Sequence, residues 1–158
     1  MIINVFFAPQ SIGGATRIVQ DHVRELQEHL SDQYDVTVLC IDHQPWQAAV
    51  AEGPVSLQIH DWCGARVVRF GLPGKPWSWH HDGQVEQVCR DWFRRERFDL
   101  IHAHSMQVLT AAPLRVAKEL DIPYLVTLHD AWWLSPSQFL TTSSGEFVDP
   151  SNPHAHHG

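Results

Sequence analysis

The chain has 158 residues, of which 44% are hydrophobic, and its formal net charge at pH 7 is −7. This length allows one compact domain with a sizeable core, and the hydrophobic content is typical of a globular protein and not of a disordered one. The acidic balance argues against nucleic-acid binding, because domains that bind nucleic acid usually carry a basic footprint.

The cysteines and the apolar segments indicate the cellular compartment. Cys40, Cys63 and Cys89 are widely spaced and match neither a zinc knuckle nor a CxxC redox pair, so we expect reduced thiols. The N-terminus lacks the pattern of a signal peptide, and no apolar segment approaches the roughly 20 residues that span a bilayer. We therefore expect a cytoplasmic protein.

The first part of the chain has the pattern of a β-α-β unit. Residues 2–8 and 34–41 are apolar stretches that predict two buried strands. Between them, a helix begins near the pair Gly13 and Gly14, and its predicted inward face consists of apolar residues at helical spacing: Ala15, Ile18, Val19, Val23, Leu26 and Leu30. Parallel strands joined by a helix imply a right-handed crossover.

The remaining elements continue this alternation. Residues 45–80 read as an irregular or hairpin insertion, in which two short strands are joined through the letters CGA. Beyond it the pattern predicts a helix over 83–96 and a strand with its exit loop over 98–105. A second helix over about 107–120 and a strand over 122–130 follow, and Pro113 makes the start of that helix uncertain.

This order of elements predicts an α/β fold: a doubly wound, mainly parallel, Rossmann-like sheet with helices on both faces. We assign residues 1–134 to this domain. Residues 135–158 are rich in Ser, Thr, Pro and His without periodicity, so we expect a loop or a frayed tail there.

Ligands of such sheets bind at the carboxyl ends of the strands, and a glycine pair follows the first predicted strand. Gly13 and Gly14 open a helix, where free backbone N–H groups and the helix dipole favour a phosphate. The pair matches neither GxGxxG nor a P-loop. Taken alone, such a pair is more often a structural turn than an anion site.

Histidines follow two further strands. His102 and His104 flank one residue on a predicted strand, so their side chains point the same way, and a metal site of the HxH type is conceivable. His129 and Asp130 follow the next strand, and Asp130 could complete a metal triad or cap the next turn. No cysteine or carboxylate cluster accompanies the histidine pair, which favours substrate binding or helix capping over a metal.

Two adjacent tryptophans come directly after this polar pair. Trp132 and Trp133 point in different directions in either a strand or a helix, so one is expected in the core. The other can line a cleft, where an indole stacks on a sugar ring or a lipid chain.

Three segments, SIGGATRIVQDHVRELQ, FDLIHAHS and IPYLVTLHDAWWL, resemble in order and spacing the N-terminal domain of family 4 glycosyltransferases of the GT-B fold. That family shows a glycine pair at the first helix, a D-hydrophobic-hydrophobic-H-x-H strand end, and a P-x-x-x-T-x-H-D segment after the next strand. The resemblance covers about residues 1–140, with 45–80 unassigned.

The resemblance implies a retaining enzyme that moves a sugar from a nucleotide-diphosphate donor to a glycan or lipid-linked acceptor. It assigns Gly13 and Gly14 to the donor diphosphate and His129 to the reacting centre. His104, Ser105, Asp130 and Trp132 would bind substrate. It implies no metal and no cofactor besides the nucleotide sugar.

In the family, a C-terminal domain binds the nucleotide through a basic residue and an E-x7-E element, neither of which we find in this sequence. The chain therefore looks like the front half of a GT-B enzyme, and we expect it to be inactive alone. Two alternatives stay open: a stand-alone acceptor-binding or split-enzyme subunit, and a metal-dependent hydrolase that uses His102, His104, His129 and Asp130.

The unassigned stretch bears on the acceptor. It contains four tryptophans that suggest a partly apolar surface, for a lipid-linked acceptor or for docking to the inner face of the membrane: Trp46, Trp62, Trp77 and Trp79.

Overall fold

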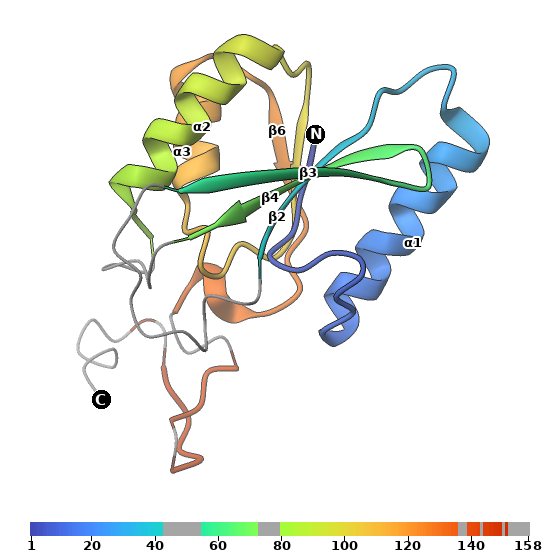
Figure 1. Ribbon diagram of the computed structural model, residues 1–158. Helices are drawn as coiled ribbons and strands as arrows, with labels where there is room; N and C mark the ends of the chain where they lie inside the picture. The colour runs from blue at the N-terminus through green and yellow to red at the C-terminus, as the bar shows by residue number, and fades with distance from the viewer. Residues whose placement is uncertain (43–54, 73–79, 136–138, 143, 150, 152–158) are drawn as a thin grey trace. The chain divides into compact units, whose positions relative to one another are not determined.

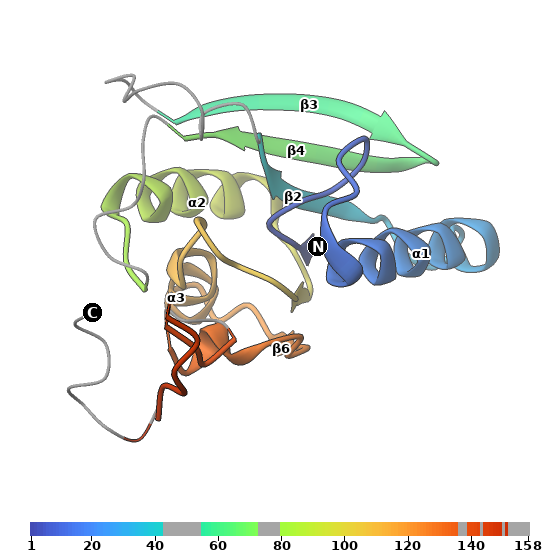
Figure 2. The ribbon, with the colours of Figure 1, turned by 90° about the horizontal axis from the view of Figure 1, so that it is seen from below.

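The computed structural model describes residues 1–42, 55–72, 80–135, 139–142, 144–149 and 151. The chain divides into two units, Met1–Thr127 and Leu128–Gly158, and each is described by itself. The first unit has the predicted α/β fold. One sheet carries α1 on one side and both α2 and α3 on the other, as Figures 1 and 2 show from two directions.

The sheet has six strands in the order β3-β4-β2-β1-β5-β6. All neighbours are parallel except the β3–β4 hairpin at one edge. The strands are β1 (Ile2–Ile3), β2 (Thr37–Ile41), β3 (Ser56–Trp62), β4 (Ala65–Gly71), β5 (Ile101–Ala103) and β6 (Tyr124–Val126). The predicted doubly wound, mainly parallel sheet is confirmed.

The first strand is shorter than predicted. Residues 2–8 were expected to be extended throughout, but β1 ends at Ile3. The Asn4 side chain donates to the carbonyl of Phe6 at 2.6 Å, which bends the chain back on itself. Backbone hydrogen bonds still join Asn4 to Leu39 (3.0 Å) and Val5 to Ser105 (2.7 Å), so the buried chain continues in the sheet's centre without strand geometry.

Helix α1 (Gly13–Leu30) buries a face that agrees only in part with the predicted one. Val19 and Val23 pack on the sheet as expected, but Ile18 is 56% exposed, and Thr16 and Gln20 are buried in its place. Gln20 is tolerated there because its amide nitrogen donates to the carbonyl of Gln10 at 3.0 Å and its amide oxygen accepts from Ser11 at 3.2 Å.

The predicted hairpin is part of the sheet. Cys63 and Gly64, with φ of 51° and 84°, form the two-residue turn between β3 and β4. Positive φ at both turn positions gives the twist that suits a tight hairpin. Trp62, at the end of β3, packs its ring edge-on against Phe7 at 5.0 Å, so this tryptophan belongs to the core. Trp46, Trp77 and Trp79 lie outside the described residues.

Helix α2 (Gly83–Glu96) matches its predicted bounds and packs on the other face of the sheet. Trp92 contacts Phe70 of β4 at 6.0 Å between ring centroids, and Phe98 closes the cluster at 5.2 Å from Trp92. Aromatic pairs in such edge and tilted arrangements add to the burial of their surface. This cluster fixes α2 to the sheet.

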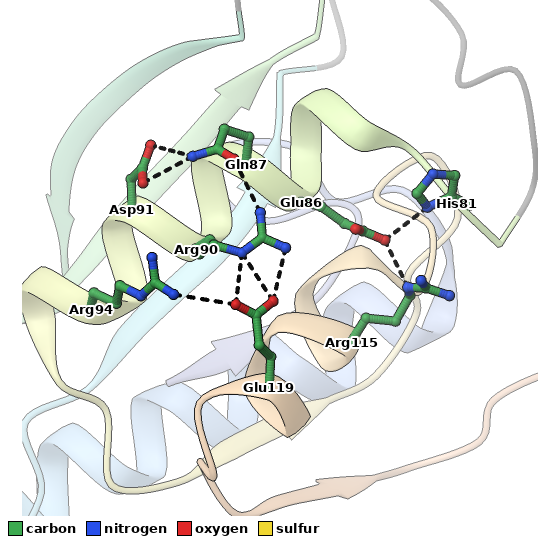
Figure 3. Close-up of polar contacts among 8 residues, drawn as sticks. All are labelled: His81, Glu86, Gln87, Arg90, Asp91, Arg94, Arg115 and Glu119. Atoms are coloured by element: carbon green, nitrogen blue, oxygen red, sulfur yellow. Dashed lines mark hydrogen bonds and ion pairs between the residues drawn. The ribbon is translucent and has the colours of Figure 1, made fainter.

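Helix α3 (Ala112–Glu119) lies beside α2, and charged side chains join the two helices (Figure 3). Glu119 accepts hydrogen bonds from Arg90 at 2.8–2.9 Å and from Arg94 at 3.3 Å. On α2, Glu86 pairs with Arg115 at 2.7 Å. The helix begins later than predicted, with Pro113 in its first turn, because proline lacks the N–H that a preceding turn would need.

The second unit contains the 3-10 turn η2 (Ala131–Trp133) and a bridge between Thr141 and Phe147. Within the described ranges of the whole chain, no helix is both long and apolar enough to cross a membrane.

Candidate functional site

The N-terminus of α1 is open to solvent. Gly13 has φ of +79°, a backbone conformation that other residues adopt only with strain, and Gly13 and Gly14 are both exposed. A Cβ built on either glycine meets no atom within 4 Å beyond its chain neighbours and its own helix backbone. No side chain caps this end and no acidic residue lies in the first turn, so its amides and the positive end of the helix dipole are available to an anion.

A buried arginine holds the loop that leads to these glycines. Arg69 of β4 is only 6% exposed, and its Nη2 donates to the carbonyls of Phe7 (3.0 Å) and Ala8. Its Nη1 lies 3.4 Å from Oε1 of Gln10. The guanidinium thus satisfies the carbonyls of a loop that has left the sheet, and it places a positive charge beneath that loop.

A buried asparagine joins the glycine-bearing helix to the histidine-bearing strand. The Oδ1 of Asn4 accepts from the backbone N–H of Ser105 at 3.1 Å, and its Nδ2 lies 3.4 Å from Oγ1 of Thr16 in the first turn of α1. Asn4 is fully buried. The segment after β5 and the start of α1 are therefore fixed to each other at one end of the sheet.

His102 and His104 point to the same side, as predicted, with ring centroids 4.1 Å apart. His104 is buried and His102 is half-buried, and the Nε2 of His102 lies 2.8 Å from Oγ1 of Thr127. A third histidine, His22 of α1, contacts both rings at centroid distances of 5.5 Å and 6.3 Å. Ser105, also buried, is held through its backbone, so an acceptor-side role for His104 and Ser105 stays a prediction.

The other predicted site residues belong to the second unit. His129 is half-buried, and Asp130 accepts the backbone N–H of Trp132 at 2.9 Å. Asp130 therefore caps η2, one of the two roles considered for it. Trp132 is buried and its ring lies 5.2 Å from that of Trp133. Convergence of these residues with the glycines stays a prediction.

The two buried thiols are not candidates for a nucleophile. Burial raises the pKa of the Cys40 thiol to about 12, although the nearby Arg69 guanidinium opposes this. Burial also raises the pKa of the Cys89 thiol well above its ordinary value. A nucleophilic cysteine needs a lowered pKa, so these residues are packing groups.

Three residues of this region escaped the sequence reasoning. Asn4 and Arg69 each stand in a run of apolar residues. A polar side chain that is buried with such a run needs a hydrogen-bond partner, so its presence in the run could have indicated a structural role. His22 lies one position before the buried Val23, at the flank of the helix's inward face. The sequence of the helix alone does not show that His22 lies next to His102 and His104.

A family model described as a glycosyl transferase 4-like domain matches residues 13–155 of the chain. No curated protein and no solved structure matches it.

Proposed function

Since the chain belongs to the glycosyl transferase 4-like family, we propose that it is the N-terminal part of a retaining glycosyltransferase. The enzyme would move a sugar from a nucleotide-diphosphate donor to a glycan or lipid-linked acceptor. The amides of Gly13 and Gly14 would face the donor diphosphate, and no metal ion would take part in the transfer.

The observation that carries this proposal is a contrast between two helices that both begin with glycine. At the start of α2, the N-cap Asp82 accepts hydrogen bonds from the amides of Gln84 (2.9 Å) and Val85 (3.0 Å), and Glu86 places an acid in the first turn. The start of α1 has neither a cap nor an acid. Its N–H groups and dipole are left for a ligand with negative charge.

The chemistry follows from the charge that develops during transfer. The bond from the sugar's anomeric carbon to the diphosphate breaks, and the leaving diphosphate gains negative charge. N–H donors that already point to that position stabilise the charge without reorganising. Arg69 would act as a positioning residue, since it orders the loop before the glycines and touches the carbonyls, not the donor.

The remaining roles rest on the family resemblance. His129 would contact the donor sugar near the reacting centre, while His104, Ser105, Asp130 and Trp132 would contact substrate. By the same resemblance a second domain binds the nucleotide. We therefore expect the purified chain to show no turnover with nucleotide sugars unless such a domain is supplied.

Amide NMR with inorganic pyrophosphate as the probe tests the central step. We expect the amides of residues 13–16 to shift on titration, while those of Gln84 and Val85, already capped by Asp82, stay in place. Shifts of equal size at both helices, or none at α1, would contradict the proposal.

A matched variant separates ligand binding from folding. In Gly14→Ala the new methyl group meets no atom within 4 Å beyond its chain neighbours and its own helix backbone, and alanine favours the helix by roughly 0.5–1 kcal/mol over glycine. We expect unchanged or higher stability in urea unfolding together with several-fold weaker pyrophosphate binding, because the added methyl would crowd a pyrophosphate at the amides. Unchanged binding by this folded variant would count against the glycine site.

A further inference from the structure

The histidines His22, His102 and His104 form a group, and the proposed transfer gives a role to His104 but none to His22 or His102. One ring nitrogen of each lies within 4.8 Å of one ring nitrogen of each of the others. The residues come from different elements: His22 from α1, His102 from β5 and His104 from the segment directly after it. We propose that this group binds one divalent transition-metal ion of the zinc type, which joins α1 to the sheet.

The ring nitrogens of the three histidines lie within 4.8 Å of one another and would have to move closer to bind such an ion. Zinc–imidazole bonds of about 2.0–2.1 Å in a tetrahedral site place ligand nitrogens roughly 3.4 Å apart. His22 is half-buried on α1, and its ring lies farther from His102 and His104 than those two rings lie from each other, so the contraction falls mainly on His22. The two strand histidines already stack at 4.1 Å between ring centroids.

The donor set selects the class of ion. Three imidazoles without a carboxylate in the group suit Zn²⁺, Co²⁺, Ni²⁺ or Cu²⁺, whereas Mg²⁺ and Ca²⁺ prefer oxygen ligands. Three protein ligands leave a fourth position, which a water molecule can take.

The surroundings orient the ligands as metal sites require. The contact between Nε2 of His102 and Oγ1 of Thr127 at 2.8 Å fixes the ring plane of His102 whichever tautomer is present. His104 is 2% exposed, which holds its ring in one position, and the half-buried His22 and His102 leave the group accessible from one side.

The consequence is a link between two elements of the predicted site. The ion would tie α1, whose first turn carries Gly13 and Gly14, to the segment that follows β5. An ion that binds only the folded chain raises its stability. The role of the ion is structural, so this proposal does not depend on the proposed transfer function.

The test is calorimetric titration of the metal-free 158-residue chain with Zn²⁺. The histidines at residues 154, 156 and 157 could also bind zinc, so they are replaced. All proteins therefore carry His154→Gln, His156→Gln and His157→Gln, and this parent is compared with His22→Gln. The matched control is His29→Gln, on the same helix, whose side chain is 67% exposed.

We expect one Zn²⁺ per chain in the parent, at least tenfold weaker binding in His22→Gln, and binding within twofold of the parent in His29→Gln. Zinc should raise the melting temperature of the parent and of the control, but not of His22→Gln. No zinc binding by the parent, or equal binding by His22→Gln, would overturn the proposal and leave ring packing as the role of the group.

A second measurement keeps the test valid if His22→Gln fails to fold. The ring-proton NMR signals of the three histidines in the parent are expected to shift together at one equivalent of Zn²⁺, and not with Mg²⁺. Shifts confined to other histidines would refute the site without any variant. Pyrophosphate plays no part in either measurement, so failure here is distinct from failure of the proposed function.

Discussion

Two buried polar side chains, Asn4 and Arg69, shape the loop that ends at the glycine pair. Asn4 directly follows β1 and Arg69 lies within β4, and both form hydrogen bonds to backbone groups outside the sheet ladder. A buried carbonyl without a donor is costly, so the loop keeps its path only while these side chains are present. The position of the exposed N-terminus of α1 therefore depends on the buried Asn4 and Arg69.

Arg69→Met removes the donors to the carbonyls of Phe7 and Ala8 while keeping much of the side-chain volume. We expect a loss of roughly 2–4 kcal/mol in the free energy of unfolding, since two buried acceptors lose a charged donor. Urea denaturation measures it.

Arg66→Met is the matched control on the same strand, because Arg66 points to the other face and pairs with Glu96 at 2.7 Å in a partly exposed ion pair. Such pairs contribute less than about 1 kcal/mol. Equal losses for the two variants would show that Arg69 has no special role in the loop.

At the scale of elements, ion pairs join α2 to α3 (Figure 3), while aromatic packing joins α2 to the sheet. The centre of the charged layer is Glu119, which two arginines of α2 contact. Hydrogen bonding from Arg90 holds the pKa of the Glu119 carboxyl below its ordinary range. A carboxyl group whose pKa is lower in the folded than in the unfolded state stabilises the fold at pH values above its unfolded pKa. This contribution is lost as the pH falls through its folded pKa.

Glu119→Gln should therefore destabilise the chain at pH 7 but have a shrinking effect as the pH falls below about 4, the ordinary glutamate range. The difference should also shrink at 1 M salt, since the pairs are partly exposed. The measurement is the urea midpoint of unfolding of the wild-type chain and of Glu119→Gln between pH 7 and pH values below about 4.

Glu28→Gln, at an exposed position of α1, removes the same charge without touching α3 and should not reproduce the loss. A Glu119→Gln effect that is constant with pH would mean that Glu119 acts through packing and not through its charge.

At the scale of the whole domain, the sheet divides the core into two layers, and each layer holds one cysteine. Cys40 of β2 faces α1, and Cys89 of α2 lies on the opposite side, while Cys63 is exposed in the hairpin turn. Burial raises the pKa of both core thiols, so they should react with a thiol reagent only when their layer of the core opens.

We expect an aromatic disulfide reagent to modify one thiol per chain quickly in the native state, and the other two only at the rate of global unfolding. Cys63→Ser should abolish the fast phase and leave the slow one unchanged. A second fast thiol would show that one layer opens independently of the other.

The sequence by itself determined the order and type of the elements. Periodicity is a local property, so the helix at 83–96, the hairpin joined at Cys63 and Gly64, and the shared direction of His102 and His104 could all be predicted. The motifs also sufficed for the family, which the match over residues 13–155 supports.

Only the tertiary structure decided which side chains meet. The early end of β1 and the burial of Gln20 instead of Ile18 depend on hydrogen bonds between segments, which no single-element pattern contains. Arg69 reaches the glycine loop, and His22 reaches the strand histidines, because the crossover of α1 sets it on one face of the sheet. Contacts of this kind depend on how elements are placed against one another, and local sequence carries no direct signal of that placement.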